Sequence, residues 1–572
     1  MAKGNIIVVE ACSTGYNYVA DIIKRGYEPI VLESVVDEAS KEFFKGYRES
    51  CYSMFPRKVT IIPAMEKYED YLRTVKKYNP VLVIAGEENA VELATRLADD
   101  LGLVGNKYSN IDKYTKKNVM HSTLIEHGVR GIRGRVIHSM EEVDDFVKEL
   151  GHENVVIKPT RGAGSTGVRL CSSLEEIKKN VADVMGKVNY FGTIISEVLL
   201  QERIFGNEYI VNTVSRNGKH RVTSIWKYDK VRTEEGAYIY NTTESVNKLE
   251  PGNTELIEYA YKVLDALDVV NGPVHGEYMI DKKGPVLIEV NCRPMGLSMP
   301  AEFLDLVTGQ HETDSILDAL LDPVGFEAKL SKPYTTLRKG MCKLFIAPKE
   351  LTVAAEPVRV ILNHMRSVYK TTVGKVNRLF RMHKTVDLET NVGVVYMVHD
   401  NPEVVRFESD FLHQAESRFF RMLFHGTGKK ETPLSKNCLS VRDVMEMTSC
   451  RGSTLVFSDD PKCTTLDAMV LPVSSIDKAL DGFDQVIIDF PEYGSGTKTE
   501  QSVENIFKAM EKVKNGGRLI VPERFYQMVP YGRAMIEELM IIGGFTVLAP
   551  VFGVHDVVCG MKNIDALKTM TV

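Results

Sequence analysis

The stretch from residue 274 to 294 constrains the fold most, because it predicts two alternating strands joined by a Lys-Lys-Gly turn at 282–284. Alternate side chains of a strand share a face, so Glu277 of the first strand can meet Glu289 and Asn291 of the second. Carboxylate and amide oxygens are ligands that suit a hard ion such as Mg²⁺. The hairpin therefore indicates a metal site, although an amphipathic surface hairpin with ordinary acids stays open at this point.

A second signal is the glycine-rich segment 161–167, which follows a predicted buried strand ending near Lys158. Its GxGxxG spacing is followed by a short strand and not by a helix, which argues against a dinucleotide-binding turn. The helix begins later, at a capping box formed by Ser173 and Glu176. We therefore expect the glycines to form the tip of a β-hairpin that can fold its N–H groups over phosphates, with Lys158 as a point charge. A glycine-rich turn without a ligand is the alternative.

Two further segments have a composition that suits a nucleotide site. An apolar strand near residue 198 runs into a polar link whose main-chain groups could pair with a base edge, at Gln201, Glu202 and Ile204. Glu208 could then accept ribose hydroxyls. Upstream, Lys117 opens a predicted amphipathic helix that ends at Gly128 and whose expected buried residues are Met120, Leu124 and Ile125.

Taken in chain order, these elements resemble the ATP-grasp superfamily of ADP-forming carboxylate–amine ligases, and within it the branch similar to L-amino-acid ligases. The resemblance covers roughly residues 1–420, and its specific motifs lie between about 113 and 296. It implies two lobes that clamp ATP, a preceding α/β domain that helps to hold substrate, and amide or peptide bond formation through an acyl phosphate. ATP and Mg²⁺, with Mn²⁺ as a substitute, are the implied cofactors.

The resemblance also assigns roles by position. Contacts to the ATP phosphates are implied for Lys117, Lys158, Gly162, Ala163, Gly164 and Ser165. Contacts to adenine and ribose are implied for Gln201, Glu202, Ile204 and Glu208. The Mg²⁺ ligands would be Glu277, Glu289 and Asn291. Arg293 would hold the acyl phosphate, and Lys230 in the variable lid region would add a phosphate or substrate contact.

The reaction itself explains why these residue types are needed. A carboxylate that attacks a γ-phosphate brings two anions together, so the site must supply cations. The fixed donor fork of Arg293 can bridge phosphoryl and carboxyl oxygens, which a lysine would not do. A closing glycine-rich flap would keep water away from the mixed anhydride.

Composition agrees with a multidomain enzyme. The 572 residues include 71 basic and 77 acidic side chains, a net charge of −6, and no basic cluster, so nucleic acid is not expected as a partner. The nine cysteines contain no CxxC pair, which argues against a zinc site or a disulfide framework. The N-terminal sequence enters a strand directly, and no apolar run could cross a membrane, so we expect a cytoplasmic enzyme with no membrane partner. Small-molecule carboxylate and amine substrates are expected, while a carrier protein and a homodimer stay open.

The predicted fold class is α/β and α+β multidomain, with an N-terminal open α/β sheet, a two-lobe ATP-grasp module and a C-terminal Rossmann-like α/β domain. The expected boundaries are 1–112, 113–310 with a lid lobe at about 118–195, 311–430 as an α+β completion of the core, and 434–572. A polar Gly/Pro-containing linker at 426–433 marks the last boundary.

The C-terminal region resembles the later half of a class I methyltransferase fold, on the strands FDQVIIDFPEY at 483–493 and GGRLIVPE at 516–523 and the helix between them. The expected apolar face of that helix is Val503, Ile506, Phe507, Met510 and Val513. It lacks the acidic-Gly-x-Gly-x-Gly turn for S-adenosylmethionine, so a structural or docking role is favoured over methyl transfer. Two alternatives to a ligase stay open: a degenerate ATP-grasp nucleotide-binding scaffold or regulatory protein, and a bifunctional ligase and methyltransferase.

Overall fold

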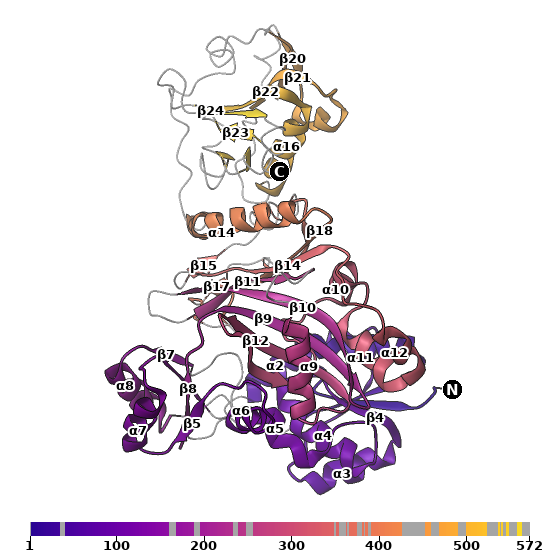
Figure 1. Cartoon of the computed structure of the whole chain (residues 1–572). Coiled ribbons are helices and arrows are strands. Elements are labelled where there is room, and N and C mark those ends of the chain that lie inside the picture. The colour runs from indigo at the N-terminus through magenta and orange to yellow at the C-terminus, as the bar shows by residue number, and fades with distance from the viewer. Residues whose placement is uncertain are drawn as a thin grey trace. The chain divides into compact units, whose positions relative to one another are not determined.

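The computed structural model describes residues 2–34, 41–159, 168–187, 195–232, 238–247, 255–347, 351–353, 362, 365–373, 380–382, 384–386, 390–425, 452–458, 468–489, 499–522, 536–537, 539–540, 545–547 and 557–562. The chain forms two compact units, Met1–Cys342 with Val386–Glu389, and Lys343–Thr385 with Thr390–Val572. Figure 1 labels many of their elements. The predicted flap at 161–167 and the predicted linker at 426–433 lie outside the described residues.

An open parallel sheet begins the first unit, as the alternating strand and helix pattern predicts. Its strands, in the order β3-β2-β1-β4, are Thr60–Ile62, Glu28–Leu32, Asn5–Val9 and Pro80–Ala85. The helices of this region are α1 Asn17–Lys24, α2 Lys41–Tyr52, α3 Tyr68–Lys77 and α4 Val91–Asp100. Because β2 lies on one side of β1 and β4 on the other, the carboxyl ends of β1 and β4 form the topological switch point, where α/β sheets bind ligands.

A small antiparallel sheet follows, in the order β5-β8-β6-β7. Its strands are Gly134–Ile137, Val198–Glu202, Val155–Pro159 and Arg169–Cys171. Helices α7 (Met140–Leu150) and α8 (Leu174–Val184) share one core cluster with Ile157 and Leu200. Since side chains alternate along a strand, Lys158 and Gln201 lie on the opposite face of this sheet. Ser173 is the N-cap of α8 as predicted, because the Glu176 amide donates to Ser173 Oγ at 3.2 Å, while the Glu176 carboxylate accepts from the Ser172 amide at 2.8 Å.

The third sheet of the first unit carries the predicted hairpin. Its strands run in the order β13-β12-β9-β10-β11, with bounds Gly284–Asn291, Gly272–Asp281, Asn207–Arg216, Lys219–Arg232 and Tyr238–Ser245. Strand β14 (Lys339–Leu344) borders β11, where the Gly340 amide donates to Ser245 Oγ at 2.9 Å. The hairpin is antiparallel, with Glu277 opposite Glu289 and His275 opposite Asn291, so the predicted shared face is present.

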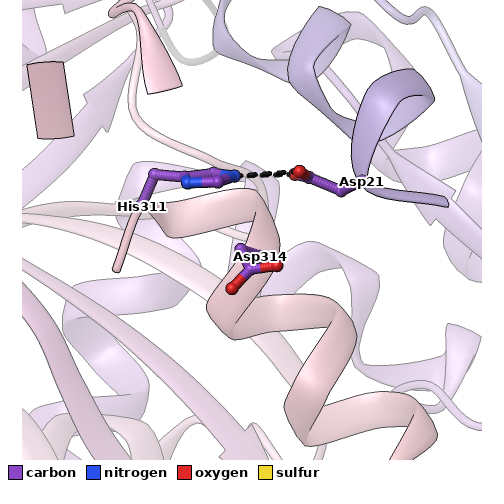
Figure 2. Close-up of side chains that lie close together, drawn as sticks. All are labelled: Asp21, His311 and Asp314. Atoms are coloured by element: carbon purple, nitrogen blue, oxygen red, sulfur yellow. Dashed lines mark hydrogen bonds and ion pairs between the residues drawn. The ribbon is translucent and has the colours of Figure 1, made fainter. Parts of the chain in front are cut away.

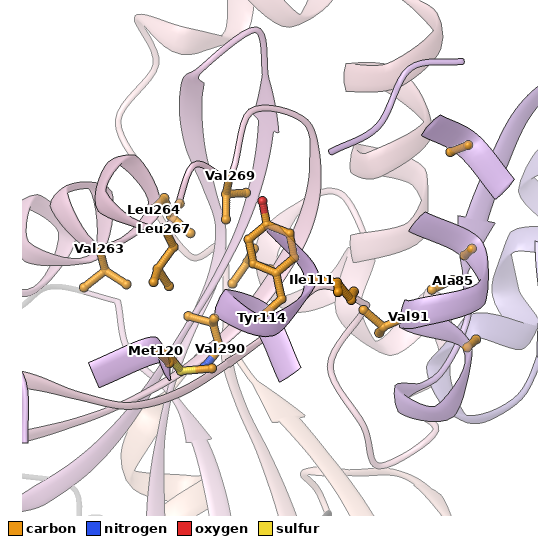
Figure 3. Packing of buried hydrophobic residues seen from close by; sticks show 14 of the residues in the cluster. Ala85, Val91, Ile111, Tyr114, Met120, Val263, Leu264, Leu267, Val269 and Val290 are labelled. Carbon is orange, nitrogen blue, oxygen red and sulfur yellow. The ribbon is translucent and has the colours of Figure 1, made fainter. Parts of the chain in front are cut away.

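The other face of this sheet is apolar, because Tyr278, Leu287 and Val290 belong to a large buried cluster. Figure 3 shows Tyr114 of α5 (Ile111–Thr115), Met120 of α6 (Lys117–Glu126) and Leu264 of α9 (Glu255–Ala266) packed in that cluster. Helices α10 (Ala301–Thr308), α11 (Glu312–Leu321) and α12 (Pro323–Leu330) follow the hairpin.

One expected core residue of α6 is not in the core. Met120 and Leu124 are buried as predicted, but Ile125 is 51% exposed. Successive residues of an α-helix point about 100° apart, so Leu124 and Ile125 cannot both face the same neighbour. The helix therefore buries its 120 and 124 positions, and the prediction for Ile125 is wrong.

The second unit contains β16 (Val368–Thr371) paired with β18 (Val394–His399), β15 (Leu351–Val353) paired with β17 (Phe380–Met382), and α14 (Pro402–His425). A six-stranded sheet follows in the order β20-β19-β21-β22-β24-β23, with bounds Met469–Leu471, Thr454–Ser458, Phe483–Asp489, Val513–Pro522, Val557–Lys562 and Phe545–Val547. The first four strands are parallel, while β24 is antiparallel to both β22 and β23.

Val513 was predicted to belong to a helix, and that prediction is wrong. Helix α16 ends at Lys512, and Val513 begins β22 opposite Phe483. A β-branched residue with a strand partner packs well in a sheet, which overrides the helical spacing. None of the helices in the described segments combines the length and apolarity that crossing a bilayer requires.

Candidate functional site

The functional face of the hairpin carries two acidic side chains that stay ionised although they are only partly exposed. Lys117 Nζ, at the start of α6, lies 2.8 Å from Glu289 Oε2. Burial acts to raise the pKa of Glu289, but Lys117 outweighs it and holds that pKa well below its usual range. Burial opposes ionisation of Glu277 as well, and the bond to His275 lowers the pKa of Glu277. Two charged carboxylates thus lie close together with one lysine.

His275 is hydrogen-bonded to Glu277 and positions its carboxylate. Its Nε2 lies 3.3 Å from Glu277 Oε1, and its Nδ1 lies 2.8 Å from Asn212 Oδ1. Asn212 in turn donates to Ser224 Oγ at 2.9 Å. His275 is only 3% exposed, so it is a hydrogen-bonded histidine inside the fold.

Glu88 connects the metal-ligand candidate Asn291 with Arg293. Arg293 Nε lies 3.0 Å from Glu88 Oε2. The Asn291 amide has two orientations: in one, Nδ2 is 3.4 Å from Glu289 Oε1, and in the other the nitrogen donates to both oxygens of Glu88 at 3.0 Å. We favour the second, because it makes two shorter hydrogen bonds and turns the amide oxygen toward Glu289. That oxygen and the carboxylates of Glu277 and Glu289 could then share one divalent cation.

Lys158 is the second lysine near these carboxylates. It is 9% exposed, and it makes no ion pair at contact distance with a carboxylate in the described part of the chain. Burial lowers the pKa of Lys158 to about 8, although Glu289 works against this shift. The neighbouring His121 is kept neutral, because burial and Lys158 lower its pKa to about 3. A buried lysine without a close counterion is suited to bind an anion.

The predicted adenine link is partly engaged by the protein. The amides of Glu202 and Arg203 donate to the carbonyls of Arg133 and Asn154, and the Glu202 side chain pairs with Arg133 at 3.0 Å. Within the described residues, the Ile204 amide has no main-chain acceptor. Gln201 is 1% exposed, and neither atom of its amide group has a partner in the described part of the chain. The Glu202 side chain is thus occupied, whereas Gln201 and Ile204 can accept a ligand.

Glu208 and Lys230 form one unit, which the sequence did not predict. Lys230 Nζ donates to both carboxylate oxygens of Glu208 at 2.7 and 2.8 Å. It also lies 4.4 Å from the ring centroid of Tyr240 and 5.1 Å from that of Tyr228. Burial opposes the charge on Lys230, but the carboxylates Glu208 and Glu277 contribute to a raised pKa. The lysine therefore stays protonated beside the site.

The loop that follows Arg293 is fixed by the N-terminal sheet region. Thr14 Oγ1 donates to the Gly296 carbonyl at 3.0 Å and accepts from the Met299 amide at 3.2 Å. Between these two anchors, Leu297 and Ser298 adopt positive φ values of 69° and 47°. Such conformations cost energy and persist where the surroundings enforce them. No local sequence pattern predicts this contact, because Thr14 lies 282 positions before Gly296.

The flap residues Gly162, Ala163, Gly164 and Ser165 lie outside the described residues. Their contacts to phosphates therefore stay predictions. All other predicted site residues are described, and the structure brings Lys117, Lys158, Glu277, Glu289, Asn291 and Arg293 together.

A second cluster has metal-ligating residue types but not the character of a metal site. Figure 2 shows His311 facing Asp21, with Asp314 nearby. His311 Nε2 is 2.9 Å from Asp21 Oδ1, and its Nδ1 is 2.8 Å from Asp305 Oδ1. Burial opposes the charge of His311, but the two aspartates outweigh it and raise its pKa to about 10. Both ring nitrogens are therefore donors, which leaves none for a metal.

Residues 152–300 match the model of the ATP-grasp domain. This match shows that the chain contains an ATP-grasp domain. The rest of the chain extends well beyond that match.

Several known proteins are similar to this chain. Dapdiamide A synthase from Enterobacter agglomerans is 26% identical over 360 residues, which covers 62% of this chain and 83% of that protein. The carbamoyl phosphate synthase large chain from Thermotoga neapolitana is 26% identical over 234 residues, which covers 38% of this chain and 21% of that protein. Among solved structures, the L-amino acid ligase from Bacillus licheniformis superimposes with a TM-score of 0.56 at 17% identity, covering 72% of this chain and 98% of that chain. This structural likeness shows the fold.

Proposed function

We propose that the chain is an ATP-dependent, ADP-forming carboxylate–amine ligase that makes an amide or peptide bond through an acyl phosphate. The observation that carries this proposal is the grouping of two ionised carboxylates, two lysines and Arg293 at one face of the hairpin. The similarity to dapdiamide A synthase supports the reaction type. A nucleotide-binding scaffold would not need an arginine beside the metal ligands.

The proposal that the site binds ATP rests on polar and charged groups that are available to a ligand. The cationic side chain of Lys158 and the Lys117 ammonium would bind phosphate oxygens. The unpartnered amide of Gln201, on the same sheet face as Lys158, and the Ile204 amide would contact the base. Glu208 would accept ribose hydroxyls while it remains bonded to Lys230. The predicted flap residues, Gly162 to Ser165, would cover the phosphates.

The residues present fit Mg²⁺, or Mn²⁺ in its place. Glu277, Glu289 and the Asn291 amide oxygen are hard oxygen donors, and two of them are already ionised. When bound, the metal would neutralise phosphate charge during transfer. The neighbouring Lys117 would then exchange its ion pair with Glu289 for a phosphate contact.

Arg293 would hold the acyl phosphate. In the first step a substrate carboxylate oxygen attacks the γ-phosphorus, and the bond to the β-phosphate oxygen breaks, which releases ADP. In the second step an amine attacks the acyl carbon, and inorganic phosphate leaves. The guanidinium fork can bridge phosphoryl and carboxyl oxygens in both steps, and Glu88 keeps it oriented. Lys230 would add positive charge beside the reacting groups.

An amino acid is the substrate class that we propose, on the basis of the similarity to an L-amino acid ligase and to dapdiamide A synthase. We also propose that the enzyme is cytoplasmic and forms a homodimer. The amine that accepts the acyl group would be either a free molecule or attached to a carrier protein. The predicted boundaries at 112, 310 and 434 also belong to the proposal. Size-exclusion chromatography with light scattering tests the homodimer.

For residues 434–572 we propose a structural or docking role. Strand β24 lies between β22 and β23 and is antiparallel to both, which is compatible with the predicted resemblance to a methyltransferase fold. However, the sequence lacks the glycine-rich turn for S-adenosylmethionine. Calorimetry with S-adenosylmethionine on the full chain should show no binding; binding would favour the bifunctional alternative.

An ADP-release screen over pairs of amino acids, with mass spectrometry of the products, tests the function. ADP and phosphate should form only when both substrates are present. Release of AMP and pyrophosphate would refute the mechanism. A Glu289→Gln variant that binds ATP and matches the wild type in turnover would favour the scaffold alternative.

A further inference from the structure

The switch point of the N-terminal sheet lies next to Arg293. Residues after β4 begin with Gly86, whose amide donates to the Val9 carbonyl at 2.8 Å. A Cβ atom on Gly86 would lie 2.1 Å from the Glu10 carbonyl oxygen, so only glycine allows the two loops to approach this closely. Glu10 itself has a φ of 51°. The loops after β1 and β4 are thus held together at the place where α/β sheets bind ligands.

Three polar atoms of the loop after β4 have no partner in the part of the chain that the structure describes. They are Glu87 Oε2 and both amide atoms of Asn89, and all three are buried. A buried polar group without a hydrogen bond costs stability, so each one calls for a missing water, ion or ligand. Between them, Glu88 is fully engaged with Arg293 and Asn291. Glu88 therefore orients Arg293, whereas Glu87 and Asn89 have polar atoms that are available to a ligand.

The charge around Glu87 favours a cation. Glu10 is satisfied, since it accepts from Arg48 Nε at 3.0 Å and from Ser34 Oγ at 2.8 Å. Burial raises the pKa of Glu87 to about 8, Glu10 adds to this, and Arg293 opposes it. The other titratable groups that face Glu87 are Glu88, Cys51, Cys12 and Tyr47. Arg293 is the single cation among these described neighbours, and it is already paired.

We propose that Glu87 and Asn89 bind the ammonium group of an amino-acid substrate. An ammonium group has three donors, and Glu87 Oε2 and Asn89 Oδ1 supply two acceptors for them. Asn89 Nδ2 remains to donate to an oxygen of the same substrate. Because Glu88 lies between these residues and holds Arg293, the bound amino acid would lie beside the proposed acyl-phosphate site. The proposal rests on the proposed ligase function for the identity of the ligand.

The ammonium group can come from either substrate, namely from the amino acid whose carboxylate is activated or from the acceptor amine. Kinetics distinguish the two sources. Wild type, Glu87→Gln and Asn89→Ala are assayed by ADP release with the active pair from the screen. Exposed Glu66→Gln serves as a matched control. We expect Glu87→Gln to raise the KM of one substrate at least tenfold and to leave the KM of ATP within about twofold.

If the affected substrate is the activated acid, its α-hydroxy or N-acetyl analogue tests the ammonium directly. Wild type should discriminate against the analogue at least tenfold in kcat/KM, and Glu87→Gln should lose that discrimination. If the affected substrate is the acceptor, its KM alone should rise. Unchanged KM values for both substrates in Glu87→Gln would overturn the proposal, and so would equal effects in Glu66→Gln.

A binding measurement separates this proposal from the ligase function. The common L-amino acids are titrated singly into the full chain and into Glu87→Gln in the presence of ADP, and thermal shift and calorimetry are recorded. Binding that weakens at least tenfold in Glu87→Gln supports the ammonium site even if no pair gives ADP. In that outcome only the ligase function fails. Equal binding in both proteins, or an absence of binding in both, would overturn the site.

Discussion

Lys158 gives the sharpest test of the nucleotide site, because its charge depends on pH in an accessible range. Burial lowers its pKa to about 8, so the free protein loses this cation as the pH rises above neutrality. The kcat/KM for ATP reports ionisations of the free enzyme. We therefore predict that kcat/KM for ATP falls at alkaline pH because Lys158 loses its proton.

The expected size follows from the fraction that is protonated. With a pKa of about 8, Lys158 is roughly 90% charged at pH 7 and roughly 10% charged at pH 9. If the neutral amine does not bind phosphate, kcat/KM for ATP falls about tenfold between these values. Lys158→Arg keeps its charge throughout this range, so the alkaline limb should disappear.

The assay is initial-rate ADP release from pH 6.5 to 9.5 at saturating carboxylate and amine. Exposed Lys76→Arg is the matched control and should follow the wild type. A kcat/KM that stays constant between pH 7 and 9 in the wild type would refute the reasoning. An unchanged alkaline limb in Lys158→Arg would assign the ionisation to another group.

Three further predictions concern His311 of the second cluster and two residues that position the loop and the arginine of the site. The His311 imidazolium, whose pKa rises from 6.5 to about 10, contributes stability that is complete below pH 6.5 and is lost as the pH approaches 10. In urea denaturation the wild type should lose at most about 5 kcal/mol over this range, whereas His311→Gln should change little; parallel curves would contradict this. Thr14→Val should lower kcat about tenfold or more with an unchanged Kd for ATP, and Thr14→Ser should restore it, because the hydroxyl clamps the loop after Arg293. Wild-type kcat in Thr14→Val would remove the clamp from the mechanism. Glu88→Gln removes the charge that pairs with Arg293 and orients it, so kcat should fall while calorimetry shows ATP binding intact; a normal kcat would contradict the role of Glu88.

Local patterns predicted the hairpin, the N-cap of α8 and the parallel sheet, since each depends on residues close in sequence. The face that carries Glu277 and Glu289 follows from strand alternation alone. By contrast, the prediction that Ile125 is buried was wrong. The apolar pattern includes both Leu124 and Ile125, but only Leu124 faces the core of the folded protein. The prediction that Val513 belongs to a helix was wrong because its strand partner Phe483 lies 30 positions away, and a local pattern cannot indicate such a contact.

The parts of the site that sequence reasoning missed are long-range contacts. Glu88 meets Arg293 across 205 positions, and Thr14 meets Gly296 across 282. Neither residue stands in a motif, and a glutamate after a strand is common on protein surfaces. The pairing of Glu208 with Lys230 also depends on how β9 and β10 are aligned. Only the folded chain brings these side chains together.

Transfer of oxygen from the carboxylate to phosphate tests the central claim most directly. The carboxylate substrate is labelled with ¹⁸O in both oxygens and incubated with ATP, amine and the protein. An acyl phosphate passes one carboxylate oxygen to the phosphate that leaves, so each inorganic phosphate should carry one ¹⁸O atom by mass spectrometry. Phosphate that forms together with the amide but carries no ¹⁸O would contradict the acyl-phosphate mechanism.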